Sequence, residues 1–145
     1  MRLLSLALLA LAPPALAGAP AAPEAPAAPE APVLTARAEC EPLLTAGRMR
    51  CVLEARLPDT ATFQWFDAQI IASPLFVMPL RGRFSADDAE VREEHLVRWG
   101  VAVVGKAEGE GELTLRVRAV ACTDREKRMC VSVVADARAR VKIGK

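Results

Sequence analysis

The sequence contains few of the residues from which metal sites and acid–base catalytic centres are usually built. It has one histidine, His95, and no tyrosine. Its four cysteines are not spaced as zinc ligands, because ten residues separate Cys40 from Cys51 and seven separate Cys122 from Cys130. Zinc sites commonly place two to four residues between paired ligands. We therefore expect no metal and no cofactor.

An excess of charge of one sign is also missing. The chain carries 19 lysines and arginines against 18 aspartates and glutamates. A nucleic-acid-binding domain would show a basic excess, so we expect no nucleic-acid partner. Asp67, Asp87 and Asp88 are the carboxylates closest to a catalytic pattern, but no nucleophile with a base partner accompanies them in the sequence. His95 follows Glu94 and is typical of a solvated or packed histidine.

Long apolar runs are missing except at the start of the chain. Residues 3–11 are apolar apart from one serine, Arg2 precedes them, and Pro13-Pro14 and the residues Ala15-Leu16-Ala17 follow. This order is typical of a secretory signal peptide, and about ten apolar residues are half of the roughly twenty that a helix needs to cross a bilayer. We predict a signal peptide at 1–17, a product that does not span a membrane, and export to the periplasm or the medium.

The next segment, residues 18–32, contains only alanine, proline, glutamate and one glycine. The hexapeptide at 20–25 is repeated at 26–31. Proline removes backbone donors and alanine offers little apolar surface, so we predict a disordered, polyproline-II-like tether of about 3 Å per residue. The remaining residues, 33–145, have the usual size of one domain.

Beyond the tether, apolar and polar residues alternate, and Val, Ile, Leu and Thr gather in short runs between turn residues. The pattern predicts an all-β domain, an immunoglobulin-like antiparallel β-sandwich of about seven strands. The expected strands are 34–40, 49–57, 62–71, 75–84, 95–105, 112–122 and 130–143. Gly109-Glu110-Gly111 is expected as a turn. Ser85 with Asp88 resembles a helix start, so 85–94 is either a short helix or an acidic loop.

Aromatic residues make up only 4% of the chain. In an all-β domain of this size they are expected to fill the core and not to line a ligand site. The large aromatic residues are Phe63, Trp65, Phe66, Phe76, Phe84 and Trp99.

In an oxidising compartment the four cysteines are expected to form two disulfides, although four cysteines allow three pairings. Proximity in the sequence favours Cys40 with Cys51 and Cys122 with Cys130, each closing a β-hairpin. Alternation of side chains along a strand places Cys40 and Cys51 on the core side, as a structural disulfide. The same count places Cys122 and Cys130 on the wetter face, near residues such as Arg118. Access and positive charge at that face favour thiol exchange.

The stretch 109–124, Gly-Glu-Gly-Glu-Leu-Thr-Leu-Arg-Val-Arg-Ala-Val-Ala-Cys-Thr-Asp, is followed by Cys130-Val131 and another alternating strand. Over about residues 105–143 this arrangement resembles the N-terminal periplasmic domain of the thiol:disulfide interchange protein DsbD. In that family, two cysteines of an immunoglobulin-like sandwich receive electrons from a membrane domain and reduce periplasmic partners. The resemblance implies that Cys122 and Cys130 are a catalytic redox pair.

Charge is unevenly distributed along the chain. Residues 85–112 hold eight acidic and three basic residues, and residues 116–145 hold nine basic and three acidic ones. An acidic edge and a basic face of this kind are consistent with docking of a charged partner or of an anionic cell-envelope surface. The candidate binding residues are Arg116, Arg118, Arg138 and Arg140. The alternative is an ordinary solvated face, on which Arg116 lies opposite Asp136 as a cross-strand ion pair.

Two functions are consistent with these patterns. The first is an exported, non-catalytic β-sandwich that acts as a binding or structural module of the cell envelope, displayed on the tether, with an envelope or secreted protein as partner. The second is a periplasmic thiol-disulfide exchange domain that uses Cys122 and Cys130. Reducibility separates them, because an exchange domain should lose one bridge to a mild dithiol while it stays folded.

Overall fold

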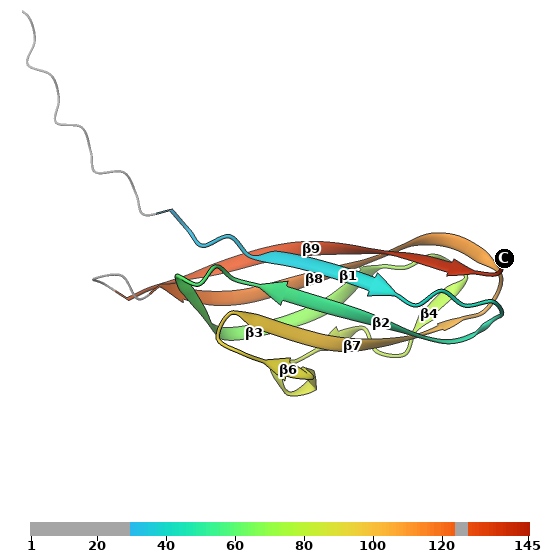
Figure 1. Ribbon diagram of the computed structural model, residues 1–145, viewed down its shortest axis with the longest axis horizontal. Helices are drawn as coiled ribbons and strands as arrows, with labels where there is room; N and C mark the ends of the chain where they lie inside the picture. Colours follow the sequence, from blue (N-terminus) through green and yellow to red (C-terminus); the bar gives the residue numbers. More distant parts are fainter. Residues whose placement is uncertain (1–29, 124–127) are drawn as a thin grey trace, which may run out of the picture.

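The computed structural model describes residues 30–123 and 128–145. The expected signal peptide at 1–17 and residues 18–29 of the expected tether lie outside the described residues. Within them, the chain forms two β-sheets that lie one on the other (Figure 1).

The first sheet has the strand order β1-β2-β7-β4, and β6 also pairs with β7. Its strands are β1 (Thr35–Cys40), β2 (Gly47–Arg56), β4 (Val77–Pro79), β6 (Val91–Arg92) and β7 (Leu96–Gly105). The second sheet has the order β5-β3-β8-β9, formed by β3 (Ala61–Ala72), β5 (Arg83–Phe84), β8 (Gly109–Thr123) and β9 (Met129–Ile143). The pairs within both sheets are antiparallel. The strands β1, β2, β3, β7, β8 and β9 occupy the places of strands A, B, C, E, F and G of an immunoglobulin-like sandwich, so the predicted fold class is confirmed.

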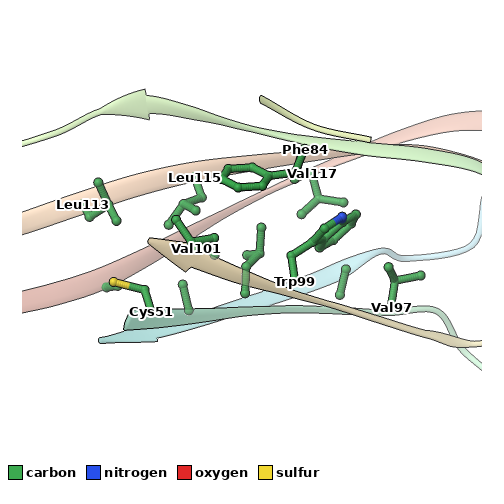
Figure 2. Close-up of a cluster of buried hydrophobic side chains, with 14 of the residues drawn as sticks. Cys51, Phe84, Val97, Trp99, Val101, Leu113, Leu115 and Val117 are labelled. Carbon is green, nitrogen blue, oxygen red and sulfur yellow. The ribbon is translucent and has the colours of Figure 1, made fainter. Parts of the chain in front are cut away.

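The core lies between the two sheets and follows from the alternation of side chains along the long strands. Alternate residues along β7 and through the middle of β8 are completely buried: Val97, Trp99, Val101 and Val103 in β7, and Leu113, Leu115 and Val117 in β8. Figure 2 shows side chains of this set filling the space between the strands. The Trp99 indole Nε1 donates a hydrogen bond to the Ser85 carbonyl at 3.0 Å, so the polar atom of the largest buried side chain has a partner.

The prediction of one strand over 75–84 is wrong, because this segment divides between the two sheets. Val77–Pro79 pairs with β7 as β4, and Arg83–Phe84 pairs with β3 as β5. Pro79 has no N–H with which to continue a ladder. The Leu80 N–H still donates to the Ala102 carbonyl of β7 at 3.2 Å, and the chain then crosses to the other sheet. We call residues 70–84 the β4–β5 edge, because β4 and β5 each end the strand order of their sheet.

The segment Gly109-Glu110-Gly111 begins β8 and is not the predicted turn, which lies at 106–108 instead. The two glycines are explained by what packs over them. A Cβ on Gly109 would lie 3.0 Å from the Phe76 ring, and a Cβ on Gly111 would lie 2.8 Å from Pro74. These glycines therefore allow the 73–76 loop to approach the strand closely.

Residues 85–94 contain a short 3₁₀ turn at Ala86–Asp88 followed by β6, which answers the question that the sequence left open. The Asp88 carboxylate accepts hydrogen bonds from the Ser85 backbone N–H at 2.8 Å and from the Ser85 hydroxyl at 2.9 Å. These bonds lower the pKa of Asp88 below its ordinary value, and they confirm the expected helix start.

The chain enters the domain at one end of the sandwich and its last residue lies at the other (Figure 1). Strands β1 and β9 contact each other along the sandwich, and a parallel bridge joins Leu43 to Ile143. Near that end Ile143 also pairs with Gly109. The end of β8 and the start of β9 lie at the opposite end, where β1 begins (Figure 1).

Candidate functional site

The outer face of the second sheet carries the predicted site residues and has two halves of different chemistry. Cross-strand register arranges its side chains in rows over β3, β8 and β9. The rows toward the β8–β9 turn are Thr62–Cys122–Cys130, Trp65–Val120–Ser132 and Asp67–Arg118–Val134. The rows toward the other end are Gln69–Arg116–Asp136, Thr114–Arg138, Glu112–Arg140 and Glu110–Lys142. The first half is thus mainly apolar and the second mainly charged.

A β-bulge in β3 brings Trp65 to this outer face. Phe63 pairs with Ala121 and Trp65 pairs with Val120, so Gln64 is an extra residue between two consecutive partners on β8. In a regular strand Phe63 and Trp65 would share a face. With the extra residue, Phe63 packs against the core and Trp65 is 48% exposed. Bulges often redirect a side chain in this way.

The prediction that all the large aromatic residues lie in the core is therefore wrong for Trp65. Trp99 and Phe84 are buried, and the other three phenylalanines pack against the core. The sequence did contain a signal for Trp65, because it alternates with the polar residues Asp67 and Gln69. Counting back from those two residues places the indole on the solvent side.

Arg118 holds the Trp65 indole in place from the neighbouring strand. Its guanidinium carbon lies 5.9 Å from the centroid of the Trp65 ring, within the range of a cation–π contact. Its Nε donates to Asp67 Oδ1 at 2.8 Å, and its Nη2 donates to Asp67 Oδ2. This bidentate pair raises the pKa of Arg118 above its ordinary value, so the cation beside the indole is permanent.

We call the apolar half of the face the Trp65 platform, made of Trp65, Val120, Val134 and the Cys122–Cys130 disulfide. Val134 is 57% exposed and Val120 is half-buried. Ser132, which pairs with Val120 and precedes Val134 by two residues on β9, is exposed. Large apolar side chains at the surface of a folded domain often mark an interaction site when they gather together.

Both predicted disulfides are present, Cys40–Cys51 and Cys122–Cys130. Cys51 is completely buried and Cys40 packs against the core, so the core-side prediction for this pair is confirmed. Cys122 and Cys130 pair across β8 and β9 on the outer face, as predicted. Their exposure differs, because Cys122 is 2% exposed while Cys130 is open to solvent. Cys130 is therefore the sulfur that a reagent can reach.

The four candidate arginines all lie on this outer face, and each contacts a carboxylate. Arg116 donates to Asp136 at 2.7 and 2.9 Å, as the register predicted, and this bond lowers the pKa of Asp136 below its ordinary value. Arg118 binds Asp67. Arg138 lies 3.5 Å from Glu112, and Arg140 contacts Glu110. The four arginines therefore form a network of ion pairs on this face, and their role in binding a partner stays a prediction.

The carboxylates that the sequence singled out are not arranged as a catalytic pair. Asp67 is held by Arg118, Asp87 lies 3.3 Å from Arg92, and Asp88 is held by Ser85 and Arg81. The single histidine, His95, places its Nδ1 2.7 Å from the Ala61 carbonyl, which ties the start of β3 to the start of β7.

No family model and no curated protein matches this sequence. A solved structure described as BslA, a bacterial hydrophobin, is similar at 9% identity over 77% of this chain and 96% of that one, with a TM-score of 0.36. A similarity of this size assigns neither a family nor a function. The described residues include no helix with the length and apolar character that crossing a bilayer requires. The resemblance to DsbD is outside these findings and stays a prediction.

Proposed function

We propose that this chain is an exported, non-catalytic binding module of the cell envelope, and that it docks a partner protein through the Trp65 platform. The observation that carries the proposal is the exposed Trp65, turned outward by a bulge and held by Arg118. Two disulfides in one small domain are typical of an oxidising compartment outside the cytosol, which supports export.

The composition of the platform supports a protein partner. Tryptophan and arginine are the residues that most often dominate the energy of protein interfaces. Because Arg118 and Asp67 already fix the indole, little side-chain freedom remains to be lost on binding.

The charged half of the face fits the polar rim that surrounds such a centre. Arg138 and Arg140 have side chains that are 71% and 76% exposed. Their charges would steer the approach of a partner more than they would hold it.

Site-specific cross-linking tests the proposal. A photoactivatable residue in place of Ser132, in the Trp65 row, should capture one envelope or secreted protein when the full chain is exported by its host. The additional change Trp65→Ala should weaken capture by about thirtyfold, the effect of a hot spot worth about 2 kcal/mol. The matched control is the same photoactivatable residue at Lys142, at the far end of the face. Capture that survives Trp65→Ala, or that is equal from Lys142, would remove the platform as the binding surface.

Thiol-disulfide exchange is the second candidate function, and the exposure of Cys130 favours it. A partner thiolate would attack Cys130 Sγ, the Cys122–Cys130 bond would break, and Cys122 would leave as a thiolate that takes up a proton. A second partner thiol would then release Cys130 from the mixed disulfide, which leaves the partner oxidised and this pair reduced. The reverse sequence would return the electrons to a partner disulfide.

Single cysteine variants distinguish this candidate from a structural bridge. Cys122→Ser leaves the accessible Cys130 free, and it should accumulate mixed disulfides with exported proteins. Cys130→Ser leaves only the buried Cys122 and is the matched control, which should accumulate none. If neither variant is found in a mixed disulfide, and the bridge of the unmodified protein resists a mild dithiol until the domain unfolds, exchange is excluded.

A further inference from the structure

Half of the exposed large apolar side chains among the described residues lie in one short segment, the β4–β5 edge. The eight such residues are Val33, Leu44, Trp65, Ile71, Leu75, Met78, Leu80 and Val134. Leu75 is 97% exposed, and Ile71, Met78 and Leu80 are 40–48% exposed. A cluster of this kind at the surface of a single domain points to contact with another body.

The fold presents Leu75 outward and holds it there. The residues on either side, Pro74 and Phe76, pack over Gly111 and Gly109. The Val77 N–H donates to the Pro74 carbonyl at 2.9 Å, and the Lys106 N–H donates to the Phe76 carbonyl at 2.8 Å. With both neighbours anchored against β8, Leu75 stands at the tip of a fixed turn.

The stretch 68–84 carries charge of one sign. From Ala68 to Phe84 the sequence contains no acidic residue and two arginines, Arg81 and Arg83. Arg81 is paired with Asp88, whereas Arg83 and Lys106 have no carboxylate within salt-bridge distance in the described part of the chain. Backbone pairing places Lys106 beside Phe76, in the turn that carries Leu75, and Arg83 opposite Gln69.

We infer that the β4–β5 edge binds the surface of an anionic lipid bilayer, with Leu75 entering the headgroup layer and Arg83 and Lys106 contacting lipid phosphates. A protruding aliphatic side chain suits a soft surface into which it can insert, and basic flanks suit anionic headgroups. Residues 68–84 add no carboxylate that an anionic surface would repel. This inference does not rest on the Trp65 platform, which lies at the other end of the second sheet.

Vesicle co-sedimentation tests the inference with the purified exported chain. Vesicles of equal parts phosphatidylglycerol and phosphatidylcholine should bind the protein, and pure phosphatidylcholine vesicles should bind it much more weakly. Leu75→Ser should lower the affinity for the anionic vesicles roughly ten- to a hundredfold, since that is the effect of burying one leucine side chain. Arg83→Gln should lower it about fivefold, and added salt should weaken the unmodified protein further.

Val33→Ser is the matched control, because it removes another exposed aliphatic side chain, just before β1 at the opposite end of the sandwich (Figure 1), and it should leave lipid binding unchanged. Leu75 is almost wholly exposed, so its variant should fold, and an unchanged thermal unfolding midpoint verifies this. No binding to anionic vesicles, equal binding to both kinds of vesicle, or binding that Leu75→Ser does not weaken would each overturn the inference. Self-association of the protein that Leu75→Ser abolishes would overturn it in favour of a second copy of this chain.

Discussion

Removing either disulfide should destabilise the domain, and the two bridges should differ because of burial and not because of loop length. In the chain-entropy account, the stabilisation grows with the logarithm of the loop that a bridge closes. The sequence separations are 8 residues for Cys122–Cys130 and 11 for Cys40–Cys51, which correspond to about 2.5 and about 2.8 kcal/mol. A difference of about 0.3 kcal/mol is too small to separate them in an unfolding experiment.

Burial adds a larger difference. Cys51 is completely buried among core side chains, so removing its sulfur also removes packing, at about 1 kcal/mol. Cys122 is buried too, but it lies outside the core cluster and its partner Cys130 is exposed, so this pair contributes less packing. The double change Cys40→Ala with Cys51→Ala should therefore cost about 3.5–4 kcal/mol, and Cys122→Ala with Cys130→Ala should cost about 2.5–3 kcal/mol.

Equilibrium unfolding in urea measures both values. The two variants and the unmodified protein should be compared without reductant, and the shift in midpoint is the readout while the denaturant slope stays constant. If the two variants lose the same stability, or if the Cys122–Cys130 variant loses more, burial of Cys51 does not set the difference. A changed slope would show that removing a bridge also alters the compactness of the unfolded chain, and the free energies of unfolding would then replace the midpoints in the comparison.

Three further predictions concern single side chains. Trp65→Phe should move the fluorescence emission to shorter wavelength and reduce quenching by acrylamide, because the remaining tryptophan is buried; an unchanged spectrum would contradict the exposure of Trp65. Gly111→Ala should lower the thermal unfolding midpoint by the equivalent of about 1–2 kcal/mol, because its Cβ would lie 2.8 Å from the Pro74 ring. Gly47→Ala is the control and should leave the midpoint unchanged, because nothing lies within 4 Å of its Cβ. Hydrogen bonds from arginines, that of Arg98 foremost, lower the pKa of Glu54 below its ordinary value. The ionised Glu54 carboxylate therefore stabilises the folded state fully above about pH 4.5, and this stabilisation is lost as the pH falls through the lowered pKa. Glu54→Gln should accordingly flatten the acid loss of unfolding free energy in urea titrations, and equal acid sensitivity of both proteins would disprove this role.

The long strands could be predicted from the sequence because their alternation is regular. In β8, Leu113, Leu115 and Val117 face the core, and the residues between them face solvent, so parity along the strand also located Cys122. The same parity, counted across the hairpin, placed Arg116 opposite Asp136. These assignments rest only on the two-residue period of a strand, which holds wherever no residue is inserted.

The sequence did not predict features that depend on an inserted residue or on contacts between distant segments. Gln64 breaks the two-residue period, so Trp65 faces solvent. Alternation counted forward from Phe63, which packs against the core, would place Trp65 on the core side instead. The glycines at 109 and 111 are typical of a turn until the packing of Pro74 and Phe76 against them is known. Likewise, the division of 75–84 between two sheets depends on where β3 and β7 lie in space, which the residues of that segment do not encode.

The opposite placement of the two ends of the domain gives the molecule a direction. β8 has 15 residues and therefore extends roughly 50 Å, from the Phe76 ring over Gly109 to the disulfide beside the β8–β9 turn. The last residues lie at the Leu75 end, where Ile143 pairs with Gly109 and the Gly144 N–H donates to the Leu43 carbonyl at 2.8 Å. A bulky group attached after Lys145 would therefore shield the proposed lipid contact, while one placed before residue 30 would leave it open. The attachment point of a fluorophore or affinity tag thus decides which of the two surfaces of this protein can be observed.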